Sequence, residues 1–426
     1  MLDKRIIEKV LTEQMEEITT AKRSKFCPRD EELQVDLESE LAQVVLGVRR
    51  SGKSIMCHNV LAKQPNTFAY ADFDDERLLD IASEDLDNVL EVLYKIYGTF
   101  SLLFLDEIQN VDGWYLFVNR LLRKKIHIVV TGSNAKLLSA ELATHLTGRY
   151  EPITLYPFSF KEFCLYKNVD VRKLTTEAEG LRRAAFDTFL SQGGFPELMK
   201  VQNSTRYIGT LVQSILKRDV EKRYRIRHIL AFENLAQHLL NVAPAIIDYK
   251  ELSKIVGISS AHTTENYVKY LSDAFLIRLL HKYSPKSKQR IVDSKVYAVD
   301  VALMSEREES LSGENLGWRL ETMVYIELLR RNAPLEQDIF YYKKRPKTEE
   351  ADFVVCRKNR VLQIIQVSYD ISNEKTRNRE IKGLIAAAQA TKCENLLLIT
   401  DHERADIHER GYSIAIRPAY EWMLDK

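Results

Sequence analysis

The sequence has no long apolar run, few cysteines and almost no net charge. No stretch of its 426 residues approaches the about 20 consecutive apolar residues that cross a bilayer, so we expect neither a transmembrane helix nor a membrane partner. The charged amphipathic start, MLDKRIIEKVLTEQMEE, lacks the apolar core of a signal peptide. The five cysteines are scattered without a CxxC pair, which argues against a zinc site or a disulfide framework and predicts a cytoplasmic protein. A net charge of +1 leaves only local basic surfaces for nucleic acid.

The segment GVRRSGKS, residues 47–54, has the spacing G-x-x-x-x-G-K-S and lies between an apolar strand (43–47) and a helical pattern. Glycines allow the backbone to curl so that its N–H groups surround phosphate oxygens, and the helix N-terminus adds its dipole. Lys53 is predicted to contact the β- and γ-phosphates, and the Ser54 hydroxyl to bind Mg²⁺. The expected nucleotide-binding residues are Gly47, Val48, Arg49, Arg50, Ser51, Gly52, Lys53, Ser54 and Ile55.

Two further apolar strands end in polar residues. SLLFLDEIQN (101–110) places Asp106 to hold Mg²⁺ and Glu107 to orient and deprotonate the attacking water, although adjacent acids also cap helices. HIVVTGSN (127–134) places Ser133 or Asn134 to sense the γ-phosphate or the water, or forms an ordinary turn. Strands that alternate with helices predict an α/β fold with a parallel sheet and its ligand at the carboxyl ends of the strands.

A fourth strand, FAYADFDDERLL (68–79), ends in acids that either flank this site or form a solvated turn. Arg49 and Arg50 then have two interpretations: they contact a neighbouring subunit, or they pair with the acids of 72–75.

The segments GVRRSGKS, FLDEIQN, VVTGSNAKLLSAELATHLTGRY and LYPFSFKEF, with Trp114, resemble a group of archaeal and bacterial AAA+-type ATPases. No guanine-reading N-K-x-D segment follows the loop, but the sequence by itself does not separate ATP from GTP. The resemblance implies that ATP is the nucleotide. It implies that Arg149 contacts the γ-phosphate of a neighbouring subunit, which requires a homo-oligomer; the alternative is a structural arginine. It also implies that Pro196, in SQGGFPEL, packs over the adenine as part of a helical lid, whereas the alternative is a plain helix-ending turn.

The same resemblance implies a helical or winged-helix region and a C-terminal domain of restriction-endonuclease-like fold. The rhythm of 249–300 is helix, turn, helix, strand and return strand, which is typical of a winged helix with its wing at 284–290. A second helix there would present polar side chains to a nucleic acid: Ser259, His262, Thr263, Asn266 and Lys269. The strip KRDVEKRYRIRH (217–228) is a further basic surface, which alternatively is a solvated helix face or an ion-pair surface between subunits.

A restriction-endonuclease-like site needs an acid on a helix, an aspartate on a strand, and an acid-x-lysine pair on the next strand. Glu321 and Asp352 match the first two positions, but Gln366 and Ser368 replace the third pair. An amide is a poor Mg²⁺ ligand and a serine cannot supply the missing charge, so we expect this domain to be catalytically degenerate.

We therefore expect four parts: a P-loop ATPase domain (1–158) with an N-terminal helix, a helical lid (159–230), a winged-helix-like domain (231–305) and a restriction-endonuclease-like domain (306–426). The predicted function is Mg²⁺-dependent ATP binding and hydrolysis that moves the C-terminal domains. The alternatives are an ATP-gated nucleic-acid-binding switch and, less favoured, an ATP-dependent nuclease. The sequence does not name a protein partner.

Overall fold

The computed structural model divides the chain into two compact units. One comprises Met1–Pro157 with Asp273–Phe275, and the other Phe158–Ser272 with Leu276–Lys426. The structure describes residues 2–21, 26–63, 68–133, 146, 148–284, 294–304, 316–344 and 349–425. In these ranges, no helix combines the length and the apolar character that a bilayer crossing needs.

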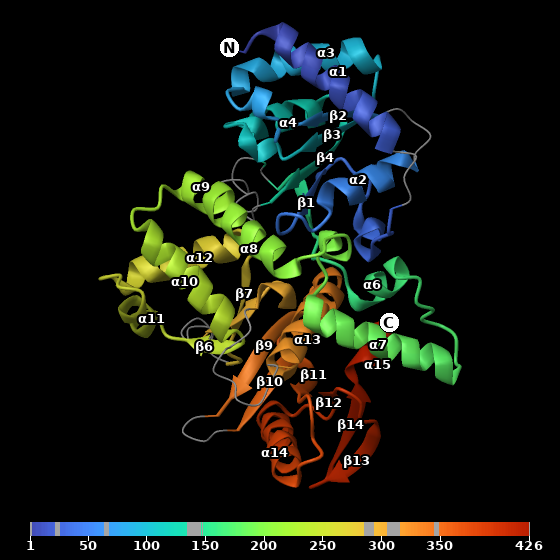
Figure 1. Cartoon of the computed structure of the whole chain (residues 1–426), viewed down its shortest axis with the longest axis vertical. Helices are drawn as coiled ribbons and strands as arrows, with labels where there is room; N and C mark the ends of the chain where they lie inside the picture. Colours follow the sequence, from blue (N-terminus) through green and yellow to red (C-terminus); the bar gives the residue numbers. More distant parts are fainter. Residues whose placement is uncertain are drawn as a thin grey trace. The chain divides into compact units, whose positions relative to one another are not determined.

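The first unit is built on a five-stranded parallel sheet with the order β2-β3-β4-β1-β5 (Figure 1). Its strands are β1 (Ala42–Leu46), β2 (Phe68–Asp72), β3 (Leu102–Asp106), β4 (His127–Gly132) and β5 (Tyr150–Thr154). Its helices are α1 (Lys4–Ala21), α2 (Lys53–Ala62), α3 (Leu86–Tyr97) and α4 (Trp114–Arg123). Strands β1 and β3, which flank the central strand β4, are buried along their whole length, as expected for a sheet with both faces covered. The expected α/β fold with a parallel sheet is confirmed.

Strand β5 was not expected from the sequence. It lies at the sheet edge, where it pairs with β1 in the described part of the chain, and its adjacent residues Glu151 and Pro152 are exposed. Both residue types are uncommon inside strands, and proline is tolerated at an edge because it removes an N–H donor. The pairing of β1 with β5 is therefore a tertiary feature that the local pattern concealed.

The second unit begins with helices that precede a small antiparallel sheet of order β6-β8-β7. The helices are α6 (Phe160–Tyr166), α7 (Thr176–Gln192), α8 (Ser204–Ser214), a π-helical turn (Ile215–Glu221), α9 (Lys222–Tyr224) and α10 (Ile229–Val242). There follow β6 (Ala245–Ile247), α11 (Tyr249–Ile255), α12 (Ala261–Asp273), β7 (Ile277–His281) and β8 (Ser294–Ala298). Within 249–300 the order α11, α12, β7 and β8 agrees with the expected helix, turn, helix, strand and return strand. The wing expected at 284–290 lies outside the described residues except for Ser284.

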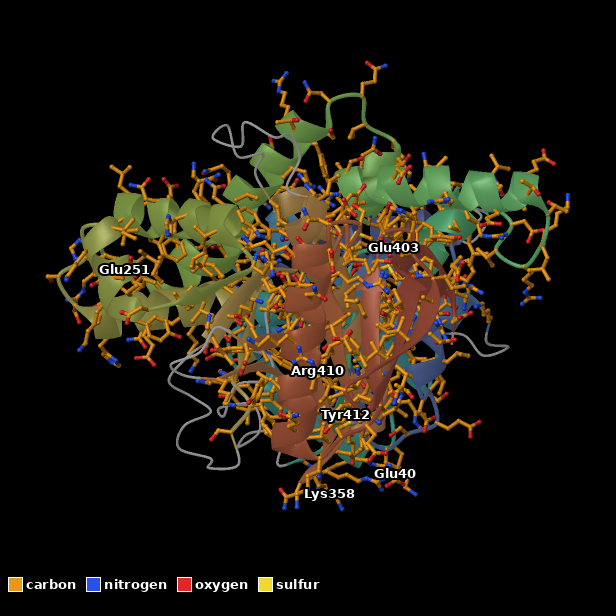
Figure 2. The ribbon with its side chains drawn as sticks, turned by 90° about the horizontal axis from the view of Figure 1, so that it is seen from below. Glu40, Glu251, Lys358, Glu403, Arg410 and Tyr412 are labelled. Atoms are coloured by element: carbon orange, nitrogen blue, oxygen red, sulfur yellow. The ribbon has the colours of Figure 1, made fainter. Side chains whose placement is uncertain are left out.

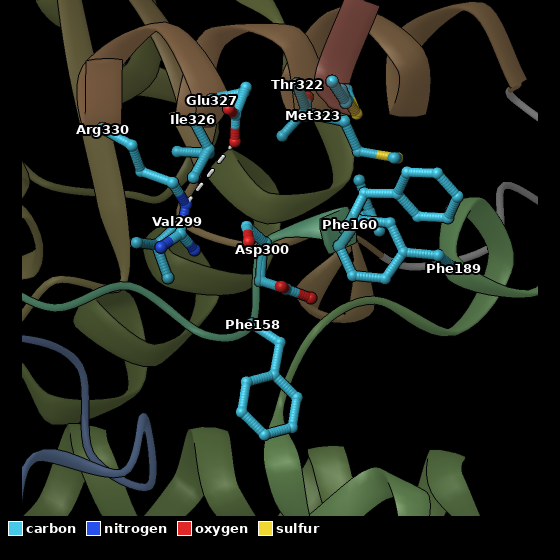
Figure 3. A pocket seen from close by; sticks show the side chains of 13 residues that line it. Phe158, Phe160, Phe189, Val299, Asp300, Thr322, Met323, Ile326, Glu327 and Arg330 are labelled. Carbon is cyan, nitrogen blue, oxygen red and sulfur yellow. Dashed lines mark ion pairs between the residues drawn. The ribbon is translucent and has the colours of Figure 1, made fainter. Parts of the chain in front are cut away.

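The turn at Gly193–Gly194 is fixed inside this unit. The N–H of Gly194 donates to Asp300 Oδ2 at 2.9 Å, and the N–H of Phe158 donates to the Gly194 carbonyl at 2.7 Å. A Cβ on Gly193, whose φ is +79°, would lie 2.0 Å from Asp300 Oδ1, so only glycine fits. Asp300 and Phe158 also line a small cavity of about 30 Å³ (Figure 3). The contact with Asp300 accounts for the glycines without a nucleotide, and the adenine contact of Pro196 stays a prediction.

The C-terminal part is a six-stranded mixed sheet of order β13-β14-β12-β11-β10-β9 (Figure 1). Its elements are α13 (Leu316–Asn332), β9 (Asp338–Lys343), β10 (Glu350–Arg357), β11 (Arg360–Val367), α14 (Glu374–Thr391), β12 (Leu396–Thr400), β13 (Ala405–Glu409), β14 (Tyr412–Pro418) and α15 (Ala419–Leu424). Strands β9, β10 and β11 form an antiparallel meander, after which β12 joins β11 in parallel. Figure 2 labels Lys358, in the β10–β11 turn, and Arg410, in the turn of the unexpected β13–β14 hairpin.

Helix α14 approaches the sheet closely at Gly383. A Cβ there would lie 2.1 Å from the Glu350 carbonyl oxygen, so a side chain would force α14 away from β10. Close approach buries an apolar core under the helix that includes Leu384, Ile364 and Leu398. This packing positions the ends of β10 and β11 beside α13, where the degenerate site was expected.

Candidate functional site

The loop between β1 and α2 takes the curled path that the glycines predicted. A Cβ on Gly47 would lie 2.0 Å from the Leu155 carbonyl oxygen, so this position must be glycine. Gly52 has a φ of +96°, and Arg50 also adopts the left-handed region with a φ of +68°. The second left-handed position was not expected, because non-glycine residues rarely adopt it. These turns deliver the chain to the N-terminus of α2, where unpaired backbone N–H groups favour an anion.

Lys53 is the first residue of α2, and its side chain folds back so that the ammonium contacts the loop. Its Nζ donates to the carbonyls of Gly47 at 3.2 Å and Val48 at 3.4 Å, and lies 3.7 Å from Glu107 Oε1. Only 5% of the lysine is exposed. The positive charge is thus held over the loop, where a phosphate chain would meet it.

Asp106 ends β3 as a buried carboxylate surrounded by hydroxyl groups. Its Oδ1 accepts from Thr131, its Oδ2 accepts from Tyr70 at 3.3 Å, and Ser54 also donates to it. Burial raises the pKa of Asp106, the neighbouring Glu107 raises it further, and the hydrogen bonds from Ser54 and Thr131 oppose this rise. A carboxylate bonded to a hydroxyl offers two hard oxygen ligands at one point, a donor set that suits Mg²⁺. Ser54 and Asp106 therefore fit the expected metal.

Glu107 is fixed by its backbone and by its carboxylate. Its φ of +49° turns the chain sharply after β3, and its N–H donates to Thr131 Oγ1 at 3.1 Å. Its Oε2 accepts from the N–H of Ser133 at 3.3 Å and from Gln109 Nε2. The structure thus brings Glu107, Lys53 and Ser133 together; Asn134 lies outside the described residues.

Sequence reasoning missed two hydroxyls that hold these acids. Thr131 is fully buried on β4 and bonds both Asp106 and the Glu107 N–H, which fixes the angle between the two acids. Tyr70 reaches Asp106 from β2. The neighbour in the sheet register, Asp72, has its pKa raised to about 8 by burial and by Asp106. Both contacts require β2, β3 and β4 to be adjacent so that their ends meet. The sequence does not specify this adjacency, so it contained no usable signal for either hydroxyl.

Arg29 is a further unpredicted residue that supports the loop. The residue is 5% exposed, and its guanidinium donates to the carbonyl oxygens of Ser51 at 2.9 Å and Tyr156 at 2.6 Å. It therefore connects the phosphate loop to the segment that leaves the first unit. Its position, 18 residues before the loop with no recognisable pattern, gave no signal.

The remaining loop residues differ in their surroundings. Arg49 forms an ion pair with Asp74 at 2.9 Å, the second of the two interpretations that the sequence left open. Val48 is buried in the core, whereas Ile55 is 47% exposed on α2.

Arg149 is exposed and lies just before β5. Its carbonyl accepts from the N–H of Ala42, the first residue of β1. The phosphate loop leaves the opposite end of β1, about 13 Å away at about 3.3 Å per residue. The side chain therefore lies beyond reach of the phosphate loop of its own chain.

The four positions of the expected degenerate nuclease site line one cleft in the second unit. Its volume is about 550 Å³, and its lining includes Glu321, Asp352, Gln366 and Ser368. Gln366 is built into the structure, because its Oε1 accepts from the Asp352 N–H at 3.2 Å and its Nε2 donates to Glu380 at 2.7 Å. Ser368 Oγ donates to the Asp370 carbonyl at 3.2 Å. The same cleft contains Lys295, which no motif had indicated.

Comparison with known proteins separates the chain into three matched segments. Residues 39–164 match the model of an AAA domain, and two domains of unknown function match residues 183–311 (DUF8612) and 316–418 (DUF4143). An uncharacterized protein of Methanocaldococcus jannaschii is 34% identical over 441 residues, covering 100% of this chain and 96% of the relative. An uncharacterized protein of Haemophilus influenzae is 28% identical over 359 residues, covering 78% of this chain and 84% of the relative.

Among solved structures, the chain has a TM-score of 0.25 to Cdc6p from Pyrobaculum aerophilum, at 12% identity, covering 67% of this chain and 94% of that one. It has the same TM-score to a signal transduction ATPase with numerous domains from Pyrococcus horikoshii, at 14% identity, covering 73% of this chain and 46% of that one. These values are too low to carry an argument. The 34% identity over the full length shows the family of the chain. The chain belongs to the family of the Methanocaldococcus jannaschii protein, with an AAA domain of the P-loop ATPase type followed by two domains of unknown function.

Proposed function

We propose that this protein binds Mg²⁺-ATP and hydrolyses it at the carboxyl edge of the first sheet. The observation that carries the proposal is the convergence of a buried Lys53, a Ser54–Asp106 pair and an oriented Glu107 on one glycine-curled loop. The matched AAA domain covers all four residues. This combination supplies phosphate binding, a metal position and a base within a single site.

The protein residues have separate tasks in this reaction. Lys53 and the N–H groups at the start of α2 hold the phosphates, and Ser54 and Asp106 hold Mg²⁺. When bound, Mg²⁺ neutralises charge on the phosphate oxygens. Glu107 accepts a proton from the attacking water, and its bonds to Ser133 and Gln109 keep its carboxylate aimed at that position.

The proposed enzyme is a homo-oligomer in which Arg149 completes the site of a neighbouring subunit. The support is geometric: Arg149 is exposed and lies at the end of β1 opposite its own phosphate loop. An arginine there adds positive charge to the transition state only in trans. Light scattering with and without an ATP analogue tests this, and a monomer in both conditions contradicts it.

We further propose that nucleotide state moves a winged-helix-like domain and a restriction-endonuclease-like domain, within the four-part division at 158, 230 and 305. The order of α10, β6, α11, α12, β7 and β8 supports the first assignment. A helix, a three-strand meander, a helix and a parallel strand, in α13 to β12, support the second.

An ATP-gated nucleic-acid switch is a second candidate, favoured by exposed basic residues in the second unit. Lys217, Arg218, Lys222, Arg225 and Arg227 are all exposed in the basic strip. On α12, His262 and Lys269 are exposed, but so is Glu265, and Glu251 is exposed on α11 (Figure 2). Contacts with phosphates release counterions, so this candidate requires binding that weakens steeply with salt.

The proposed hydrolysis is tested by phosphate release from Mg²⁺-ATP and by the Glu107→Gln variant. We expect the wild type to turn over ATP and the variant to bind ATP but to hydrolyse it about 100-fold to 10,000-fold more slowly, because an amide cannot accept the proton. Asp112→Asn, an exposed acid on the same loop, is the matched control and should retain activity. Equal rates for wild type and Glu107→Gln would remove Glu107 as the base.

The two candidates separate in the same assay when nucleic acid is added. Single-stranded DNA, duplex DNA and RNA are compared at low and moderate salt. Stimulation that disappears as salt rises favours the switch, and an unchanged rate favours a protein partner.

A further inference from the structure

The cleft between β8, α13 and β10 contains a buried lysine surrounded by carboxylates. Lys295 Nζ lies 2.7 Å from Glu321 Oε1, 3.2 Å from Glu350 Oε1 and 3.3 Å from Asp352 Oδ1. The lysine is 6% exposed, on a strand that is otherwise fully buried. An ammonium group has three N–H donors, so three carboxylates saturate it.

Each carboxylate also has a second partner. Tyr297 OH donates to Glu321 at 2.6 Å, and the N–H of Val367 donates to Asp352 Oδ2 at 2.9 Å. The third acid, Glu350, binds Lys343 at 3.1 Å through its other oxygen. The acids are therefore arranged around an ammonium and are satisfied in that arrangement.

The charges agree with this geometry. Burial disfavours a charged lysine, but Glu321, Asp352 and Glu350 outweigh it and raise the pKa of Lys295 above its usual range. Burial and Glu321 raise the pKa of Asp352, which reduces the negative charge that one ammonium must balance. At neutral pH the lysine stays positive.

The residues in this cleft do not fit a divalent cation. Magnesium needs oxygen ligands at about 2.0–2.1 Å, yet the ammonium takes the position at which the acids converge. Gln366, at the third ligand position, is neutral and committed to Asp352 and Glu380. No group of three or more histidine, cysteine, aspartate or glutamate side chains is arranged to hold a metal anywhere in the described part of the chain.

We propose that Lys295 is a built-in replacement for the catalytic cation of a restriction-endonuclease-like site and keeps the C-terminal cleft free of metal. The lysine lies in the segment matched at 183–311, and its three acids lie in the segment matched at 316–418. On this proposal, which rests on the proposed restriction-endonuclease-like fold, the position of the catalytic cation is instead an ionic connection between the two matched segments. This inference is independent of ATP hydrolysis by the first unit.

The test is a Mn²⁺ titration of the nucleotide-free full chain, by calorimetry and by fluorescence of Trp318, which lines the cleft. A Trp318→Phe background assigns the signal, because the chain has three tryptophans. Wild type should show no Mn²⁺-dependent quenching of Trp318. Lys295→Ala should gain a Mn²⁺ site at least 10-fold tighter than any in wild type, because three acids then face an empty position.

Two variants control this gain. Lys295→Ala with Asp352→Asn should lose it, because one ligand is gone. Lys343→Ala also removes a lysine from Glu350, but this lysine is 35% exposed and binds one carboxylate of the cluster, so no site should appear.

Lys295→Gln serves in the same titration if Lys295→Ala does not fold. The wild-type result decides by itself: quenching of Trp318 by Mn²⁺ in wild type, or no gain in a folded Lys295 variant, overturns the proposal.

Discussion

Lys53 in the first unit and Lys295 in the second are both nearly buried, with 5% and 6% of their surface exposed. Lys53 donates to two backbone carbonyls and has one acid, Glu107, at 3.7 Å. Lys295 has three carboxylates between 2.7 and 3.3 Å. The difference teaches that the surroundings of a buried lysine decide its role. Lys53 keeps one donor for an incoming phosphate, whereas Lys295 has used all three of its donors.

The acids in the two regions also differ in the groups that hold their carboxylates. Asp106 and Glu107 are held mainly by hydroxyl and amide groups, which orient a carboxylate without neutralising it. In the C-terminal cleft, Glu321 and Asp352 share a cation supplied by the chain itself. This difference supports the proposal of chemistry in the first unit and of a structural role for the cleft in the second.

Replacing each lysine with methionine is the strongest way to break this comparison. Lys53→Met should lower ATP turnover at least about 100-fold, through lost stabilisation of charge, and change the unfolding free energy by only about 1 kcal/mol. Lys295→Met should do the opposite: turnover stays, but unfolding becomes easier by about 3 kcal/mol, because the buried Asp352 and the half-buried Glu321 and Glu350 lose their shared cation.

Phosphate release and denaturant unfolding measure the two effects on the same preparations. A Lys295→Met protein with wild-type stability would contradict the structural role of that lysine. A Lys53→Met protein with normal turnover would contradict the site in the first unit.

Asp300 is a buried acid that accepts hydrogen bonds from the backbone N–H groups of Gly194 and Ala302. It therefore shows what burial does to a carboxyl group whose hydrogen-bond donors are backbone amides, in contrast to the acids around Lys295. Burial raises its pKa to about 6 against these hydrogen bonds. Since the folded pKa exceeds the unfolded value, stability from this group is present at low pH and is lost as pH rises through about 6. The loss between pH 4 and pH 7 should reach about 2 kcal/mol.

Asp300→Asn removes this titration. Urea unfolding of both proteins across the pH range should show the variant gaining relative to wild type as pH rises. Parallel pH profiles for the two proteins would refute the assignment to Asp300.

Thr131→Val should have the smallest effect of these changes, and it tests how the acids of the first unit are held. The change preserves the shape of the side chain but removes the hydroxyl that bonds Asp106 and the Glu107 N–H. We expect turnover to fall about 10-fold and half-maximal activity to need more Mg²⁺, as is usual when the support of a ligand is lost.

Thr99→Val, an exposed threonine just before β3, is the matched control. An unchanged Mg²⁺ requirement in Thr131→Val would show that Thr131 only supports the fold.

The sequence by itself determined the phosphate loop and the acids that follow β3. Gly47, Lys53 and Ser54 lie within the single segment 47–54, and Asp106 ends an apolar strand, so their roles depend on local spacing and on the direction of parallel strands. The succession of helices and strands in 249–300 and the strands within 339–370 and 394–403 were also visible, because apolar periodicity is local, but the β13–β14 hairpin was not.

Only the tertiary structure decided which distant residues support these sites. Thr131 and Tyr70 reach Asp106 because β4 and β2 flank β3, and Arg29 reaches Ser51 across 22 residues. Lys295 lies 57 positions from Asp352, and nothing in an apolar strand with one lysine reveals its partners. Side-chain contacts across such separations depend on how the elements pack, whereas a sequence pattern records only which face of each element is apolar.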